Sequence, residues 1–190
     1  MEPDFYARSS LDVARDLLGC VLVRDHDEDG CLSGRIVETE AYTGLDDPAS
    51  HAAARIGRTR RNDPLFGPPG TAYVHLNYGI HWCLNAVARA EGVPAGVLIR
   101  ALEPVEGQEA MRIRRGSRPE LTNGPGRLTQ ALDVGPEFQR HPLNAAPLRI
   151  MPGSPVPDEA VGRSARIGIS RAVDLPYRFT DDRSSWLTKP

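Results

Sequence analysis

The chain has 190 residues, of which 40% are hydrophobic and 25% charged, a composition that suits one globular domain over residues 1–190. No apolar run approaches the roughly 18 residues of a membrane span, and the first ten residues lack the basic-then-apolar order of a signal peptide. The net charge of −2 does not indicate a nucleic-acid binder. We therefore expect a cytoplasmic protein without a membrane partner.

The first half of the chain predicts a helix and a strand pair. Ser9 or Ser10 can cap a helix that runs to Leu18, with Gly19 as its stop. Residues 20–24 and 32–42 are typical of two strands joined by a turn over 25–30. Residues 43–70 lack periodicity, and a long connection of this kind in a compact domain is usually functional.

The second half predicts more strands than helices. Residues 70–88 indicate a hairpin that turns near 77–79, and residues 95–104 a strand that ends at Pro104. Helices are expected over 105–115 and over 124–132, where Pro125 suits a first turn. Short strands are expected at 147–151, 165–170 and 177–180. Residues 134–163 could be a linker, but too few residues follow for a second domain. The pattern predicts an α/β (α+β) fold, a largely antiparallel sheet with packed helices.

Cys20, Cys31 and Cys83 are odd in number and form no C-x-x-C pair. A disulfide framework or a zinc knuckle is therefore not expected, and three reduced, mostly buried thiols are. His75 and His81 lie six residues apart across the predicted turn, which gives only a weak indication of a metal site. We expect neither a metal nor another cofactor.

The basic residues are almost all arginine, since Lys189 is the only lysine. They gather in two clusters: Arg55, Arg58, Arg60 and Arg61, and Arg112, Arg114, Arg115 and Arg118. Guanidinium groups bind phosphate through two parallel hydrogen bonds, so the clusters are candidates for contacts with a nucleic acid. The alternative is that they are solvated surface.

Two glutamates in the strand over 32–42 carry the first chemical question. If the strand is regular, Ile36, Glu38, Glu40 and Tyr42 share one face, because side chains alternate. A carboxylate beside apolar and aromatic neighbours can serve as a general base. Two carboxylates could instead form a glycosidase pair, but on one strand they aim the same way. A third possibility is that both simply pair with arginines.

Aromatic residues are only 6% of the chain, so their clustering is informative. The predicted hairpin contains five ring-bearing residues: Tyr73, His75, Tyr78, His81 and Trp82. They could form part of the core, or they could stack on a planar ligand. Tyr78 lies at the predicted turn, and an exposed ring at a hairpin tip is a candidate wedge between stacked bases.

Four ordered blocks resemble one family. They are "GRIVETEAYTGLDDPASHA", "PGTAYVHLNYGIHWCLNAV", "GVLIRALEP" and "LTNGPGRLTQAL". Together they are similar to the alkyladenine DNA glycosylase family, the 3-methyladenine DNA glycosylases that are not of the helix-hairpin-helix type, over about residues 4–179. The resemblance implies a curved, mostly antiparallel sheet. It also implies a monomer in base-excision repair that removes alkylated or deaminated purines from double-stranded DNA at the nucleoid, with 3-methyladenine, hypoxanthine and ethenoadenine as the class of lesion.

The resemblance also implies roles for residues at matching positions. Glu40 matches the general base that activates water, Arg100 matches a residue that holds the water and the target phosphate, and the backbone of 165–170 matches the lining of the water site. Glu38 matches no catalytic residue and is expected to pair with an arginine. The two glutamates are thereby separated by the resemblance and not by the strand pattern.

The same comparison assigns the base pocket. Tyr42 and His51 match residues that contact the flipped base, and Asn85 matches an amide that discriminates against guanine. His75 stands at a third stacking position, where relatives can carry Tyr, and Tyr78 matches the residue that fills the gap left in the duplex. Rings in these positions would attract a cationic base by about 0.5–2 kcal/mol.

Three further hypotheses follow. A glycosylase that also cuts the strand generally uses an amine, and the sole lysine, Lys189, is outside every matched block, so a monofunctional enzyme that leaves an abasic site is expected. The alternatives are a binding module without turnover and a hydrolase of free nucleosides. The arginines of residues 55–61 favour a polymer over a free nucleoside, and intact Glu40 and Arg100 favour turnover.

Overall fold

One long strand organises the fold of the computed structural model, which describes residues 1–188. This strand, β2 (Gly30–Tyr42), pairs antiparallel with β5 (Ala95–Glu106) along one edge. On its other edge, β1 (Val21–His26) pairs with the first half of β2, and β9 (Arg178–Asp181) pairs with Glu38–Glu40. The two glutamates therefore lie on a strand that is covered on both edges.

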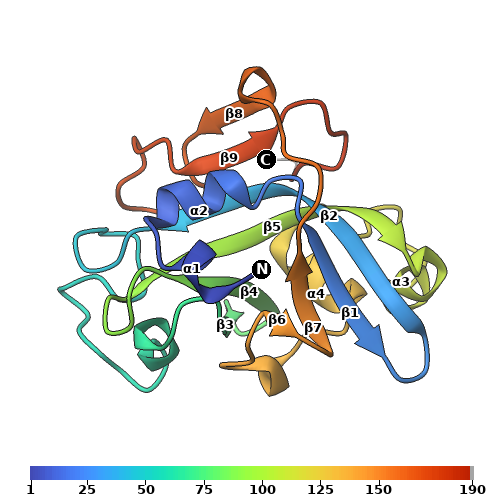
Figure 1. The fold of residues 1–190 in the computed structure, drawn as a ribbon, viewed down its shortest axis with the longest axis horizontal. Coiled ribbons are helices and arrows are strands. Elements are labelled where there is room, and N and C mark those ends of the chain that lie inside the picture. Colours follow the sequence, from blue (N-terminus) through green and yellow to red (C-terminus); the bar gives the residue numbers. More distant parts are fainter. Residues whose placement is uncertain (189–190) are drawn as a thin grey trace.

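The remaining strands extend the same sheet. β4 (His81–Ala88) pairs with β5, and β3 (Ala72–Asn77) pairs with β4. β7 (Leu148–Met151) pairs with β1, β6 (Asn144–Ala145) with β7, and β8 (Val161–Ser164) with β9. Within residues 1–188 all nine strands belong to one sheet, and every pair is antiparallel (Figure 1). The predicted α/β (α+β) class with a curved, mostly antiparallel sheet is confirmed.

Short helices cover the sheet. α1 (Pro3–Tyr6) leads into α2 (Ser10–Asp16), which begins after Ser9, whose hydroxyl caps it by accepting from the amide of Leu11 at 3.2 Å. α2 packs on β2, where Thr39 donates to the carbonyl of Ala14 at 2.7 Å, and it lies beside β9 (Figure 1). α3 (Gln108–Arg114) packs on α4 (Pro125–Ala131), which packs on β4 and β5. Single 3₁₀ turns span Asp63–Phe66, Pro136–Phe138 and Asp158–Ala160.

Several local predictions are confirmed. The hairpin, the strand pair and the helix at Pro125 form where they were expected. Residues 134–163 are not a linker, because β6 and β7 join the sheet. Cys20 and Cys83 are buried free thiols, and Cys31 is a half-buried one. No helix among residues 1–188 is long and apolar enough to cross a membrane.

Other boundaries were wrong. β5 does not end at Pro104 but continues to Glu106; Pro104 lies opposite Gly34 beside a register shift, where a missing N–H interrupts no regular ladder. Residues 165–170 form no strand, because the amide of Ile167 turns to Glu40. The register of β2 against β5 also shifts on both sides of Glu38, so the alternation assumed from Ile36 onward is not regular.

Candidate active site

A cavity of about 440 Å³ opens beside the end of β2 that carries Tyr42. Its walls come from β2, the 43–70 connection, the β3–β4 hairpin, β5 and the segment 167–171. Six of the seven residues predicted for the site line it: Tyr42, His51, His75, Tyr78, Asn85 and Arg100. The seventh, Glu40, is fully buried and lies behind the wall.

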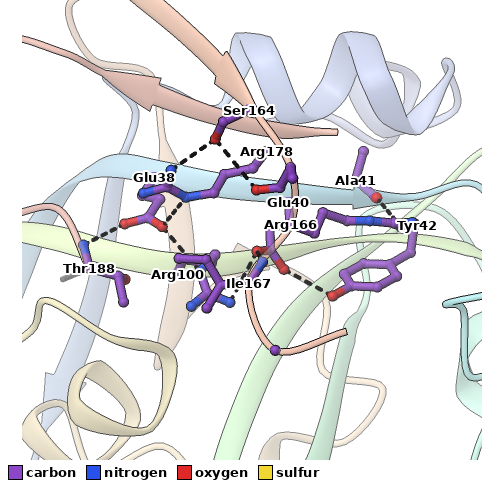
Figure 2. A network of polar contacts seen from close by, with 12 residues as sticks. Glu38, Glu40, Ala41, Tyr42, Arg100, Ser164, Arg166, Ile167, Arg178 and Thr188 are labelled. Atoms are coloured by element: carbon purple, nitrogen blue, oxygen red, sulfur yellow. Dashed lines mark hydrogen bonds and ion pairs between the residues drawn. The ribbon is translucent and has the colours of Figure 1, made fainter. Parts of the chain in front are cut away.

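Glu40 is held by three donors. Tyr42 donates its hydroxyl to Oε2 at 2.9 Å, the amide of Ile167 donates to Oε1 at 2.7 Å, and Nη1 of Arg100 lies 3.2 Å from Oε1 (Figure 2). All three of these neighbours line the cavity. Two hydrogen bonds and one ion pair therefore hold the Glu40 side chain in place. Within the segment 165–170, residues 167–170 line the cavity, as a loop and not as the expected strand.

Glu38 forms the second half of this network. Its Oε1 accepts from Nε of Arg100 at 3.1 Å and from Nε of Arg178 at 2.7 Å, and its Oε2 accepts from the amide of Thr188 at 2.6 Å. Figure 2 shows Arg100 between the two glutamates. The prediction that Glu38 pairs with an arginine is confirmed, and the bond fixes the guanidinium that reaches Glu40.

A buried ion pair that the sequence analysis missed supports Tyr42. The guanidinium of Arg166 lies 4.6 Å from the Tyr42 ring centroid and 5.3 Å from that of Tyr177. Arg166 donates to Oδ1 of Asp47 at 2.9 Å and to the carbonyl of Ala41 at 2.9 Å, and both charged side chains are inaccessible to solvent. Burial alone would lower the pKa of Arg166, but the bonds and charge of Asp47 raise it. Asp47 and Arg166 are 119 positions apart, and no local pattern in the sequence predicts that they form a pair.

The opposite part of the cavity is aromatic. His51 donates to or accepts from the Tyr73 hydroxyl at 3.0 Å, and the rings of Tyr73 and His75 stack at 5.0 Å. The amide of Asn85 lies 3.2 Å from Nδ1 of His75 and donates to the Tyr73 carbonyl at 3.1 Å. Tyr73 was noted in the hairpin cluster but not assigned to the site.

The two histidines of this wall are shifted toward the neutral form. Burial, together with His51 and Arg61, lowers the pKa of His75 to about 3. Burial and Arg61 also lower the pKa of His51. Since Asn85 has a nitrogen that donates, Nδ1 of His75 is placed to accept. The wall therefore presents uncharged rings to a ligand at neutral pH.

Tyr78 is at the tip of the β3–β4 hairpin and is 78% exposed. It adopts a φ of +51°, and Gly79 follows with +71°, so the two residues make a tight left-handed turn. Ile80 beside it is 70% exposed and was not singled out from the sequence. An exposed apolar tip at the mouth of a cavity is typical of a surface that meets a partner.

The arginine clusters divide in the structure. Arg55, Arg58, Arg60 and Arg61 are all exposed, and Arg55 lines the cavity. Arg58 pairs with Asp63, and Arg61 donates to the carbonyl of Leu76. In the second cluster Arg112 pairs with Glu109 and Arg114 with Asp29, whereas Arg115 and Arg118 form no ion pair among residues 1–188. The described residues, 1–188, contain no group of three or more His, Cys, Asp or Glu able to hold a metal.

A cavity with stacking rings, a buried carboxylate behind it and an exposed tyrosine at its mouth is typical of one class of protein. These are the enzymes that extrude a base from nucleic acid and cleave its glycosidic bond.

Comparison with known proteins identifies the family. Residues 4–185 match the family described as Methylpurine-DNA glycosylase (MPG). A protein of Salinibacter ruber is 48% identical, covering 94% of this chain and 93% of its own, and one of Carboxydothermus hydrogenoformans is 47% identical, covering 97% and 96%. One of Rubrobacter xylanophilus is 52% identical, covering 86% and 84%. Each of the three bears the name "Putative 3-methyladenine DNA glycosylase". The chain belongs to the methylpurine-DNA glycosylase family and is a DNA-3-methyladenine glycosylase of base-excision repair.

Proposed function

We propose that this enzyme extrudes alkylated or deaminated purines, of the 3-methyladenine, hypoxanthine and ethenoadenine class, from duplex DNA and hydrolyses their glycosidic bond. It acts as a monomer at the nucleoid and leaves an abasic site. The observation that carries the proposal is the position of Glu40, which three cavity-lining groups hold directly behind the cavity wall.

In this mechanism Glu40 is the general base. A water molecule at the cavity wall gives a proton to the Glu40 carboxylate, and its oxygen attacks C1′ of the sugar. The glycosidic bond breaks, and its electron pair leaves with the purine. The sugar acquires positive charge along this path, and the carboxylate stabilises it. Arg100 orients the carboxylate through Nη1, and its position in the cavity lining supports a contact with the target nucleotide's phosphate.

The rings and Asn85 select the base. An alkylated purine is cationic, and the neutral rings of Tyr42, His51 and His75 attract a cation through their electron-rich faces. Asn85 lies against the same wall and can reject the exocyclic amino group of guanine by steric and hydrogen-bond mismatch. Tyr78 fills the space that the extruded nucleotide leaves.

The small number of amino groups in the chain supports a monofunctional enzyme, one that does not also cut the strand. Lys189 is the only lysine and lies outside the described residues. The amine of Met1 donates to the carbonyl of Ile150 at 3.0 Å, and neither residue lines the cavity. A Schiff base with the abasic sugar would need such an amine at the cavity.

A panel of duplexes tests the proposal. Each duplex carries one lesion, and released base and abasic sites are measured under single-turnover conditions. Release of at least one of the three lesion types, with no strand cleavage and no covalent trapping under borohydride, is the expected outcome. Trapping would refute the monofunctional part, and absence of release from every lesion would refute the whole.

A further inference from the structure

A second pocket, of about 370 Å³, adjoins the base cavity where the β3–β4 hairpin meets α4. It is lined chiefly by Asn77, His81, Arg115, Arg118, Asn123 and Arg127. Three residues, Asn77, Cys83 and Pro125, line this pocket and the base cavity alike, so the two hollows share a wall. We call it the arginine pocket.

Within residues 1–188, the arginines of this pocket have no carboxylate partners. Arg115, Arg118 and Arg127 form no ion pair among residues 1–188, and no acidic residue lines the pocket. Arg127 donates only to the carbonyl and the side chain of Asn123, at 3.1 and 3.2 Å. Other arginines of the chain, such as Arg35, are neutralised by two carboxylates. The pocket thus keeps its positive charge available.

The buried guanidinium of Arg115 is destabilised by its neighbours in the pocket. Arg115 is 6% exposed, and its Nε donates to the carbonyl of Glu120 at 3.2 Å while Nη1 donates to Gln130. Burial and the charges of Arg118 and Arg127 lower the pKa of Arg115, and the charge of Glu120 only partly opposes them. Three like charges that repel one another around one hollow are stabilised when an anion enters it.

We propose that the arginine pocket binds a backbone phosphate of the DNA duplex, next to the nucleotide whose base enters the cavity. The proposal rests on the proposed function, because it needs DNA docked at the Tyr78 tip. The shared wall brings the pocket beside the flipped nucleotide. Contacts of arginine with phosphate fix the register of a protein on DNA without reading sequence. This contact would also explain how a chain of net charge −2 holds an anionic polymer.

Two charge removals test the site. Arg118 is exposed and Arg127 half-buried, so Arg118→Ala with Arg127→Ala should leave the fold intact. The matched control is Arg112→Ala, a nearby exposed arginine that pairs with Glu109 and does not line the pocket. Affinity for duplex DNA is measured against salt concentration. The double variant should bind roughly tenfold more weakly and lose about 0.9 from the salt slope, while the control keeps the wild-type slope.

The outcomes separate this proposal from the proposed function. If wild type releases no lesion, the proposed function fails, whatever the binding shows. If wild type releases a lesion and the double variant keeps its affinity and salt slope, the arginine pocket does not bind DNA.

A free anion is tested by calorimetry with inorganic phosphate. Binding that the double variant loses, with an unchanged DNA salt slope, would assign the pocket to free phosphate and overturn the proposal. A scan with methylphosphonates should instead find one position that weakens wild type but not the double variant.

Discussion

The hydroxyl of Tyr42 donates a hydrogen bond to Oε2 of Glu40 across 2.9 Å. The two residues are separated by one residue on β2 and lie on the same side of it, yet only the tyrosine lines the cavity. Burial and the charge of Glu40 raise the pKa of Tyr42 well above its ordinary value, so the phenol remains a donor. Tyr42 therefore has two contacts, since its ring lines the cavity and its hydroxyl holds the Glu40 carboxylate.

Tyr42→Phe separates these two contacts. The ring remains, so affinity for lesion DNA should change little, but Glu40 loses one of its donors. A hydrogen bond to a charged group is worth about 1.5–3 kcal/mol, and we expect kcat to fall about tenfold. Tyr177→Phe is the matched control, because its ring also contacts Arg166 but no hydrogen bond joins it to Glu40. Equal losses in both variants would contradict the role of the Tyr42 hydroxyl.

Glu40→Gln should remove turnover and leave binding. The amide keeps the shape of the carboxylate but cannot take a proton from water, and loss of a general base typically costs a factor of 10²–10⁴. Single-turnover excision should fall by about this factor, while affinity for lesion DNA in a gel-shift assay stays within a few-fold of wild type. Unchanged excision would remove Glu40 from the mechanism.

Glu38→Gln should act first on stability. Glu38 is fully buried and pairs with Arg100 and Arg178, and loss of one partner of a buried pair leaves the other charge uncompensated. We expect the free energy of unfolding to fall by roughly 3 kcal/mol, as measured by urea denaturation. Any loss of activity should come from a misplaced Arg100. A Glu38→Gln protein with wild-type stability would show that the network does not depend on this charge.

The sequence predicted the parts of this site that depend on local pattern. Alternation along 32–42 placed Glu40 with Tyr42, and the glycine after Tyr78 placed that ring at a hairpin tip. The resemblance then chose Glu40 over Glu38. Both choices concern residues that are close together in the chain.

The parts that were missed depend on contacts between distant residues. The register shifts around Glu38 arise where β5 and β9 both pair with β2, which no local window contains. Asp47 and Arg166 form an ion pair between distant segments, and the backbone amide of Thr188 donates to the carboxylate of Glu38. Likewise, the composition of an arginine cluster does not say which members carboxylates will neutralise: within residues 1–188, Arg114 pairs with a carboxylate and Arg115 does not.

Tyr78→Ser should weaken base extrusion from duplex DNA. The exposed ring is the only large side chain of the described hairpin turn that also lines the cavity, so serine leaves the vacated space in the stack unfilled. Excision from duplex should fall at least tenfold more than excision from single strands, which need no unstacking of a paired base. Ile80→Ser removes a neighbouring exposed apolar group and should have a smaller effect. Equal losses on duplex and single strand would exclude a wedge.

The stability of the protein should fall in acid partly because of His75. Its pKa is about 3 in the folded protein against 6.5 when exposed, since burial and the nearby His51 and Arg61 disfavour the cation. Between these values the unfolded chain binds a proton that the folded chain does not, so stability is lost as the pH falls through 6.5 toward 3. His75→Phe keeps a ring but does not titrate.

The free energy of unfolding of wild type and of His75→Phe, measured by urea denaturation from pH 7 to pH 4.5, tests this linkage. The variant loses a hydrogen-bond acceptor for Asn85, which lowers its stability by a similar amount at every pH. The slope should differ instead: wild type should be steeper by up to about 1.4 kcal/mol per pH unit. His51, whose pKa is lowered too, should leave a residual slope in the variant. Parallel curves would show that His75 titrates alike in the folded and unfolded chains, and that the wall of the base cavity is not kept neutral by burial.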